Sequence, residues 1–107
     1  MCTAVSTGRF FGRTLDVESE WGGEVTRIGN IIGMARLARG VPLWFDGANE
    51  HGLGGAALNF PALAVYRAES EKKYNIPSYD LIGFVLERCK NVSEAAILLS
   101  DVNVTPE

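Results

Sequence analysis

Met1-Cys2-Thr3-Ala4-Val5-Ser6 opens the chain and predicts a short strand with a cysteine at its start. If Met1 is removed, Cys2 carries a thiol and a free α-amine on adjacent carbons. An α-amine has a pKa of about 7.7–8.0 and a cysteine thiol about 8.5, so the two groups titrate close together. A nucleophile beside a base of matched pKa suits proton transfer. The stretch therefore suggests an N-terminal nucleophile, although a cysteine here can also be only a small residue in a strand.

A hairpin is predicted around this strand. Residues 2–6 form its first arm, Thr7-Gly8 its turn, and residues 9–15 its second arm. Such pairing places Arg13 and Asp16 near one end of the hairpin, although the sequence leaves the register open. A guanidinium near the thiol lowers the thiol pKa, and a carboxylate near the α-amine would orient that amine. In the alternative interpretation, these two residues form a surface ion pair worth less than about 1 kcal/mol.

The remainder of the chain predicts further strands and then helices. Strands are expected at residues 24–28, 31–39, 43–46 and 53–60, with a turn at 47–52, and residues 62–76 are expected to be irregular. One helix is expected to begin at Ser78 as its N-cap and a second at Asn91, where Glu94 completes a capping arrangement. A last strand is expected at 102–104. The fold class is α+β, with antiparallel strands followed by two helices on one face of a sheet.

Length and composition indicate one globular domain, residues 1–107, and exclude several kinds of partner. The chain has 107 residues, of which 47% are hydrophobic and 21% charged, and its net charge is −3. The absence of a basic block argues against nucleic-acid binding. No apolar run approaches the ~18 residues that a membrane span requires. The first residues lack the features of a signal peptide, so a cytoplasmic location is expected.

The remaining candidate residues have simpler interpretations. A disulfide between Cys2 and Cys89 is not expected in a cytoplasmic chain. Cys89 lies on the apolar face of the first helix and is interpreted as a core residue. His51 is the only histidine, and in its charged turn it is interpreted as solvent-exposed.

Four motifs follow one another along the chain: Met1-Cys2-Thr3-Ala4, Gly12-Arg13-Thr14-Leu15-Asp16, Asp46-Gly47-Ala48-Asn49-Glu50-His51-Gly52-Leu53 and Ala57-Leu58-Asn59-Phe60-Pro61. In this order they resemble the choloylglycine hydrolase family, which includes conjugated bile salt hydrolases and penicillin V acylases. The similarity extends to about residue 104. The resemblance implies the N-terminal part of an αββα sandwich of the N-terminal nucleophile hydrolase type, in which two antiparallel sheets lie between helix layers.

The resemblance also implies a role for each matching residue. Cys2 would be the nucleophile with its α-amine as the base, and Arg13 and Asp16 would flank and tune that pair. The side-chain amide of Asn59 would donate to the oxyanion, and the loss of such a donor typically costs about 10²–10³ in rate. The acyl pocket would be lined by Leu15 and Trp21, although packing of Trp21 on the core is an alternative.

The implied reaction is acyl transfer from the amine of an amide to water, with no metal or cofactor. The expected substrates are bile acids conjugated to glycine or taurine, since an asparagine at position 59 is more similar to bile salt hydrolases than to penicillin V acylases. Penicillin V or another N-acyl amide is the alternative substrate. Because family members are often tetramers, a homo-oligomer is expected.

Two departures from the family pattern affect these expectations. The connection around residues 27–30 is shorter than in family members, which puts the shape of the pocket in question. A second oxyanion asparagine and a further active-site arginine have no matching position in these 107 residues, and neither has most of the second sheet. The alternative function is therefore a catalytically incomplete fragment that only self-associates through an open sheet.

Overall fold

The computed structural model of the chain describes residues 2–16, 20, 22–60, 62–71 and 73–106. The strands are β1 (Thr3–Thr7), β2 (Phe10–Thr14), β3 (Glu24–Ile28), β4 (Ile31–Ala38), β5 (Val41–Trp44), β6 (Asp46–Asn49), β7 (Gly54–Ala56), β8 (Tyr74–Pro77) and β9 (Val102–Thr105). The helices are α1 (Leu81–Arg88) and α2 (Val92–Ser100), and a 3-10 turn at Ser78–Asp80 leads into α1.

The first two strands form the predicted hairpin, and its register positions Cys2. Ala4 pairs with Arg13, and Thr3 pairs with Thr14. Cys2 directly precedes β1, so continuation of this register brings it level with the residues that follow β2. Asp16 is the second of those residues. The hairpin prediction is confirmed. The register, which the sequence had left open, places Cys2 near Asp16.

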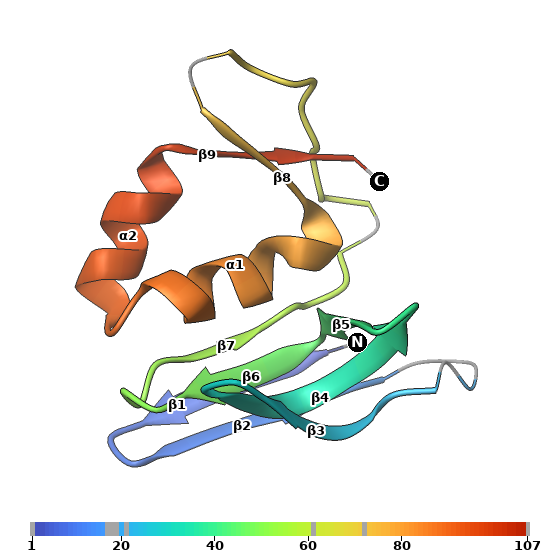
Figure 1. Cartoon of the computed structure of the whole chain (residues 1–107), viewed down its shortest axis with the longest axis vertical. Helices are drawn as coiled ribbons and strands as arrows, with labels where there is room; N and C mark the ends of the chain where they lie inside the picture. The colour runs from blue at the N-terminus through green and yellow to red at the C-terminus, as the bar shows by residue number, and fades with distance from the viewer. Residues whose placement is uncertain (1, 17–19, 21, 61, 72, 107) are drawn as a thin grey trace.

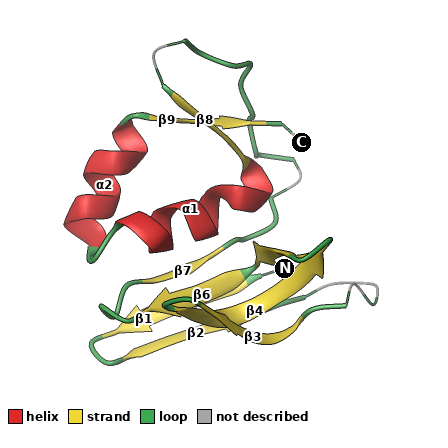
Figure 2. Ribbon diagram, in the orientation of Figure 1, coloured by secondary structure: helices red, strands yellow, loops and turns green. Residues whose placement is uncertain are grey.

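A second, larger sheet is antiparallel and combines β3 to β7. Its hydrogen-bonded order is β3-β4-β6-β7, and β5 pairs with β4 beside β6. The β3–β4 hairpin turns at Gly29-Asn30 as the sequence predicts, and Gly29 has a φ of 61° that suits glycine. In Figures 1 and 2, α1 lies across one face of this sheet, next to β6 and β7.

The predicted turn at residues 47–52 is wrong in its first half, because β6 continues from Asp46 to Asn49. The glycine that suggested a turn instead permits close packing. A side chain at Gly47 would come within 3.0 Å of Ile31 and 3.2 Å of Leu86. The predicted strand 53–60 is correspondingly shorter, with only Gly54–Ala56 in β7.

The C-terminal part contains a parallel strand pair that local sequence did not predict. β8 pairs in parallel with β9, and the two helices connect them. Residues 62–76 were expected to be irregular throughout, but β8 begins at Tyr74. Local sequence does not predict β8, because its partner β9 is distant in the chain. The prediction of a strand near 102–104 is confirmed by β9.

The two predicted helix starts have different outcomes. Ser78 begins the 3-10 turn, and neither that turn nor α1 has a side-chain cap bond, so the predicted cap is wrong. Asn91 is the N-cap of α2, and its Oδ1 accepts a 2.9 Å hydrogen bond from the backbone N–H of Glu94. The carboxylate of Glu94 in turn accepts at 2.8 Å from the N–H of Lys90, the residue before the N-cap, so the arrangement resembles a capping box displaced by one residue.

The core lies between α1 and the larger sheet. Its buried members are Ile31, Ala35, Trp44, Leu53, Leu86, Cys89 and Ala95. Cys89 is only 4% exposed, which confirms its interpretation as a core residue. The predicted α+β class, antiparallel strands followed by two helices, is confirmed. Within the described part of the chain, neither helix has the length and apolar character needed to cross a membrane.

Candidate active site

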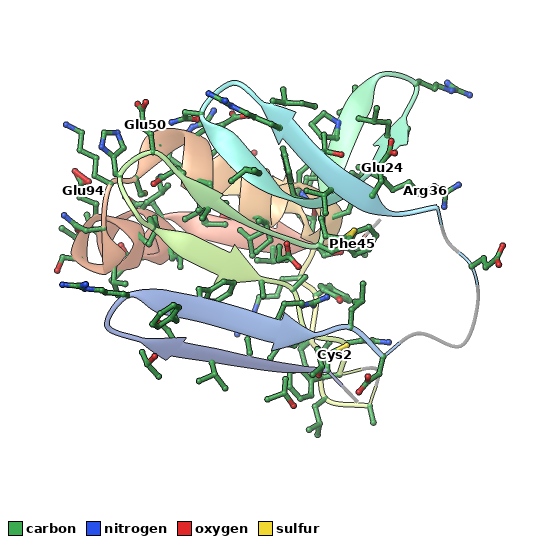
Figure 3. The ribbon with its side chains drawn as sticks, turned by 90° about the horizontal axis from the view of Figure 1, so that it is seen from below. Cys2, Glu24, Arg36, Phe45, Glu50 and Glu94 are labelled. Atoms are coloured by element: carbon green, nitrogen blue, oxygen red, sulfur yellow. The ribbon has the colours of Figure 1, made fainter. Side chains whose placement is uncertain are left out.

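Cys2 is held at the end of the hairpin where the chain enters β1. It is only 7% exposed and is a free thiol, as is Cys89. Figure 3 shows it at the same end of the molecule as Phe45, while Glu50 and Glu94 lie at the other end. Met1 lies outside the described residues, so the α-amine required by the prediction is not described.

The groups around the thiol favour its charged form, so the pKa of Cys2 is lowered. The largest cause is a hydrogen bond from the backbone of Asp16. Burial opposes it, while the backbone of Asn59 and the positive charge of Arg13 lower the pKa further. The carboxylate of Asp16 has a smaller opposing effect. The net result is a thiol shifted toward the nucleophilic thiolate.

Arg13 brings a buried positive charge to this thiol. Its side chain is 7% exposed, its Nη2 donates to the carbonyl of Ala57, and its Nε lies 3.6 Å from Oδ2 of Asp46. Nε and Nη1 have no hydrogen-bond acceptor among the described residues. Buried N–H groups are costly to leave unpaired, so the described residues satisfy this guanidinium only in part.

The other predicted site residues have mixed outcomes. Asn59 is exposed, and its backbone reaches the Cys2 thiol, so the structure brings Cys2, Arg13, Asp16 and Asn59 together. Whether the Asn59 side chain donates to an oxyanion stays a prediction. Leu15 is half-buried and directly precedes Asp16. Trp21 lies outside the described residues, so its role in the acyl pocket stays a prediction.

A groove of about 480 Å³ begins beside Arg13. Its walls include Arg9, Phe11 and Ile32, and small residues between positions 47 and 54 form its floor. Phe11 packs over Gly54, where an added side-chain carbon would meet the ring at 3.2 Å. The lining combines the apolar side chains of Phe11 and Ile32 with two cations, Arg9 and Arg13, and one carboxylate, that of Asp46.

Sequence reasoning missed two groups that contact Arg13. One is the carboxylate of Asp46 and the other is the carbonyl of Ala57. Both lie in quoted motifs, but neither carries a local signal that it faces residue 13. His51, by contrast, is exposed on its turn as predicted, with Nε2 3.6 Å from the carboxylate of Glu50.

A model of the family described as linear amide C–N hydrolases, choloylglycine hydrolase family, matches residues 24–107. A conjugated bile acid hydrolase from Lactobacillus acidophilus is 34% identical over 116 residues, which are 92% of this chain and 37% of that protein. A bile salt hydrolase/transferase from Clostridium perfringens is 30% identical over 128 residues, which are 97% of this chain and 39% of that protein. The chain thus spans well under half the length of these relatives.

A solved structure supports the same relationship. A cysteine-to-alanine variant of the conjugated bile acid hydrolase from Clostridium perfringens superimposes with a TM-score of 0.81 at 29% identity. The match covers 89% of this chain and 35% of that one. The antiparallel strands followed by two helices therefore match part of the fold of that hydrolase.

Proposed function

This chain belongs to the choloylglycine hydrolase family, and from that premise we propose that it hydrolyses a linear amide through Cys2. The observation that carries the proposal is the convergence on one thiol of two backbone hydrogen bonds and a buried guanidinium. These groups belong to Asp16, Asn59 and Arg13. A lowered thiol pKa is what a cysteine nucleophile needs near neutral pH.

The proposed reaction requires removal of Met1, which places the α-amine on Cys2. That amine takes the thiol proton, and the thiolate attacks the amide carbonyl to form a tetrahedral intermediate. Asn59 donates to the oxyanion, and Arg13 stabilises the developing negative charge. The C–N bond then breaks and the amine leaves with the proton. Water attacks the resulting thioester, releases the acid and restores the thiol.

We propose glycine- or taurine-conjugated bile acids as the substrates. The support is the identity of the relatives, which are bile acid or bile salt hydrolases. Phe11 and Ile32 offer apolar contacts for the steroid acyl group, and Arg9 and Arg13 offer positive partners for the carboxylate or sulfonate of the amine part. Trp21 and Leu15 stay predicted contacts of the acyl group. The cytoplasmic location and the homo-oligomer also stay predictions from the sequence.

Incubation of the purified chain with glycocholate tests this proposal. We expect release of free glycine, detected by mass spectrometry, and an intact mass that lacks Met1. Cys2→Ala should abolish the release, whereas the matched variant Cys89→Ala should retain it. Cleavage of penicillin V without cleavage of glycocholate would instead identify the acylase alternative.

The incomplete-fragment alternative has its own signature. In that case neither amide is cleaved, although Cys2 still reacts with iodoacetamide. Size-exclusion chromatography with light scattering would then show self-association, which the exposed apolar side chains of the strands would favour, among them Val5, Phe10, Val25 and Ile32.

A further inference from the structure

Asp46 has no part in the proposed acyl transfer, yet its carboxylate faces the arginine of the site. The side chain is 17% exposed, and Oδ2 lies 3.6 Å from Nε of Arg13. Its other oxygen, Oδ1, accepts a 2.8 Å hydrogen bond from the backbone N–H of Met34. The carboxylate is thus fixed by the backbone of β4, so it is a rigid partner for the guanidinium.

The corner between β5 and β6 also fixes the second partner of Arg13. Phe45 donates its N–H to the carbonyl of Met34 at 2.9 Å, and its own carbonyl accepts from the N–H of Ala57 at 2.8 Å. The carbonyl of Ala57 then accepts from Nη2 of Arg13. Both groups that hold the guanidinium are therefore tied to one corner of the sheet, near the end that carries Cys2 in Figure 3.

Close backbone contact makes this corner rigid. A side chain on Gly33 of β4 would collide with the backbone of Asp46 and Gly47, so only glycine fits where the strands cross. Small displacements of Asp46 are therefore opposed by the packing of the sheet itself.

We propose that Asp46 is a positioning residue for the Cys2 site and that it acts by holding the Arg13 guanidinium in place. The charged and hydrogen-bonding groups that face the thiol are the backbone of Asp16 and Asn59, the guanidinium of Arg13 and the carboxylate of Asp16. Asp46 is not one of them, so its influence passes through Arg13. The relevance to catalysis rests on the proposed function, but the influence on the thiol does not require turnover.

If Asp46 is lost, its positioning role and its direct electrostatic effect predict opposite shifts of the Cys2 pKa. Loss of a nearby negative charge would by itself favour the thiolate and lower the pKa of Cys2. Release of Arg13 would withdraw a positive charge and raise that pKa. We expect the second effect, because a released guanidinium with unpaired buried N–H groups gains hydration by moving toward solvent.

The test compares Asp46→Asn with the control Glu50→Gln. The first variant keeps an oxygen for the N–H of Met34 but loses the charge that faces Arg13. The control removes a carboxylate that is 66% exposed on the neighbouring turn. The readout is the pH dependence of alkylation of Cys2 by iodoacetamide, followed on its peptide by mass spectrometry. We expect the midpoint to rise by about half a pH unit in Asp46→Asn and to stay unchanged in the control.

A double-mutant cycle with Arg13→Met decides whether the effect passes through Arg13. In that background, Asp46→Asn should produce no further shift. An equal rise without Arg13, a fall of the midpoint or no shift in the single variant would overturn the inference. Circular dichroism confirms that each variant is folded.

Kinetics supply a second readout if the chain turns over glycocholate. Asp46→Asn should then lower kcat roughly tenfold with little change in KM, because it misplaces a group near the reacting atoms. A chain that cleaves no amide would contradict the proposed function, while the alkylation midpoints would still decide the role of Asp46.

Discussion

Cys2 and Cys89 are both buried, with 7% and 4% exposure, yet their surroundings move their thiol pKa values in opposite directions. At Cys2, the hydrogen bond from the backbone of Asp16 is the largest influence, and the pKa is lowered. At Cys89, burial is the largest influence and the charge of Glu94 adds to it, so the pKa is raised. Burial alone therefore disfavours a thiolate, and directed donors are needed to reverse that effect.

The two thiols also occupy different parts of the fold. The groups that act on Cys2 come from β2, from the segment that follows it and from the irregular segment after β7. Cys89 follows α1, and its carbonyl and that of Leu86 are both satisfied by Asn49. Strand β2 thus supplies the guanidinium of the candidate site, and the segments that follow β2 and β7 supply its backbone donors.

The largest expected effect comes from removing each thiol in turn. Cys2→Ala should reduce glycine release from glycocholate by more than about 10³-fold while leaving the melting temperature nearly unchanged. Cys89→Ala should retain activity and lower the free energy of unfolding by about 1 kcal/mol, because it leaves a small cavity. Activity assays and thermal unfolding of both variants check this. Equal activity in the two variants would contradict the assignment of Cys2 as the nucleophile and Cys89 as a core residue.

Loss of Asn49 should affect the region of Cys89 selectively. This side chain is 7% exposed, donates to two carbonyls of the helix end, and accepts from the N–H groups of His51 and Leu53. Asn49→Ala should lower the free energy of unfolding by about 2–4 kcal/mol. Urea denaturation measures this, with His51→Ala as a control on the same turn.

Alkylation of the same Asn49→Ala variant shows whether the two regions are independent. Cys89 should react faster, because its surroundings open more often, and the pH midpoint of Cys2 should stay unchanged. A midpoint shift at Cys2 would show that the two regions are coupled.

Replacement of Arg13 should affect only the region of Cys2. Arg13→Met removes the positive charge that favours the thiolate, so the alkylation midpoint of Cys2 should rise by up to about one pH unit. Reactivity of Cys89 serves as the internal control. An unchanged midpoint would mean that the backbone of Asp16 and Asn59 is sufficient to lower the pKa.

The smallest expected effect is the pH dependence of the unmodified chain. The alkylation midpoint should lie below the ordinary thiol pKa for Cys2 and above it for Cys89. Because the pKa of Cys2 is lowered in the folded chain, its contribution to stability is present above the unfolded pKa and is lost as pH falls through the folded pKa. The raised pKa of Cys89 has the opposite consequence, with stability lost as pH rises through the folded value. The gain from Cys2 lies below the ordinary thiol pKa and the loss from Cys89 lies above it, so the two thiols together predict a shallow maximum of the unfolding free energy near that pKa, which denaturant unfolding at several pH values would measure.

Much of the candidate site was predictable from short-range patterns. The hairpin brings residues 2 and 16 to the same end because its turn chemistry is local, and the same reasoning placed Arg13 nearby. Asn59 was named only through a resemblance to a family, since no local pattern relates it to Cys2. Asp46 was missed as a partner of Arg13, because contact between them depends on how the hairpin meets the larger sheet.

By itself, the sequence determined the features that neighbouring residues control. These are the two N-terminal hairpins, the Asn91 cap, the change from strands to helices, and the cysteine at the start of the first strand. Only the tertiary structure decided the extent of β6, the parallel pair β8–β9 and the hold of Asp46 on Arg13. The physical reason is that local turns and caps need few partners, whereas strand pairing and buried charge pairs need segments that are distant in sequence to meet.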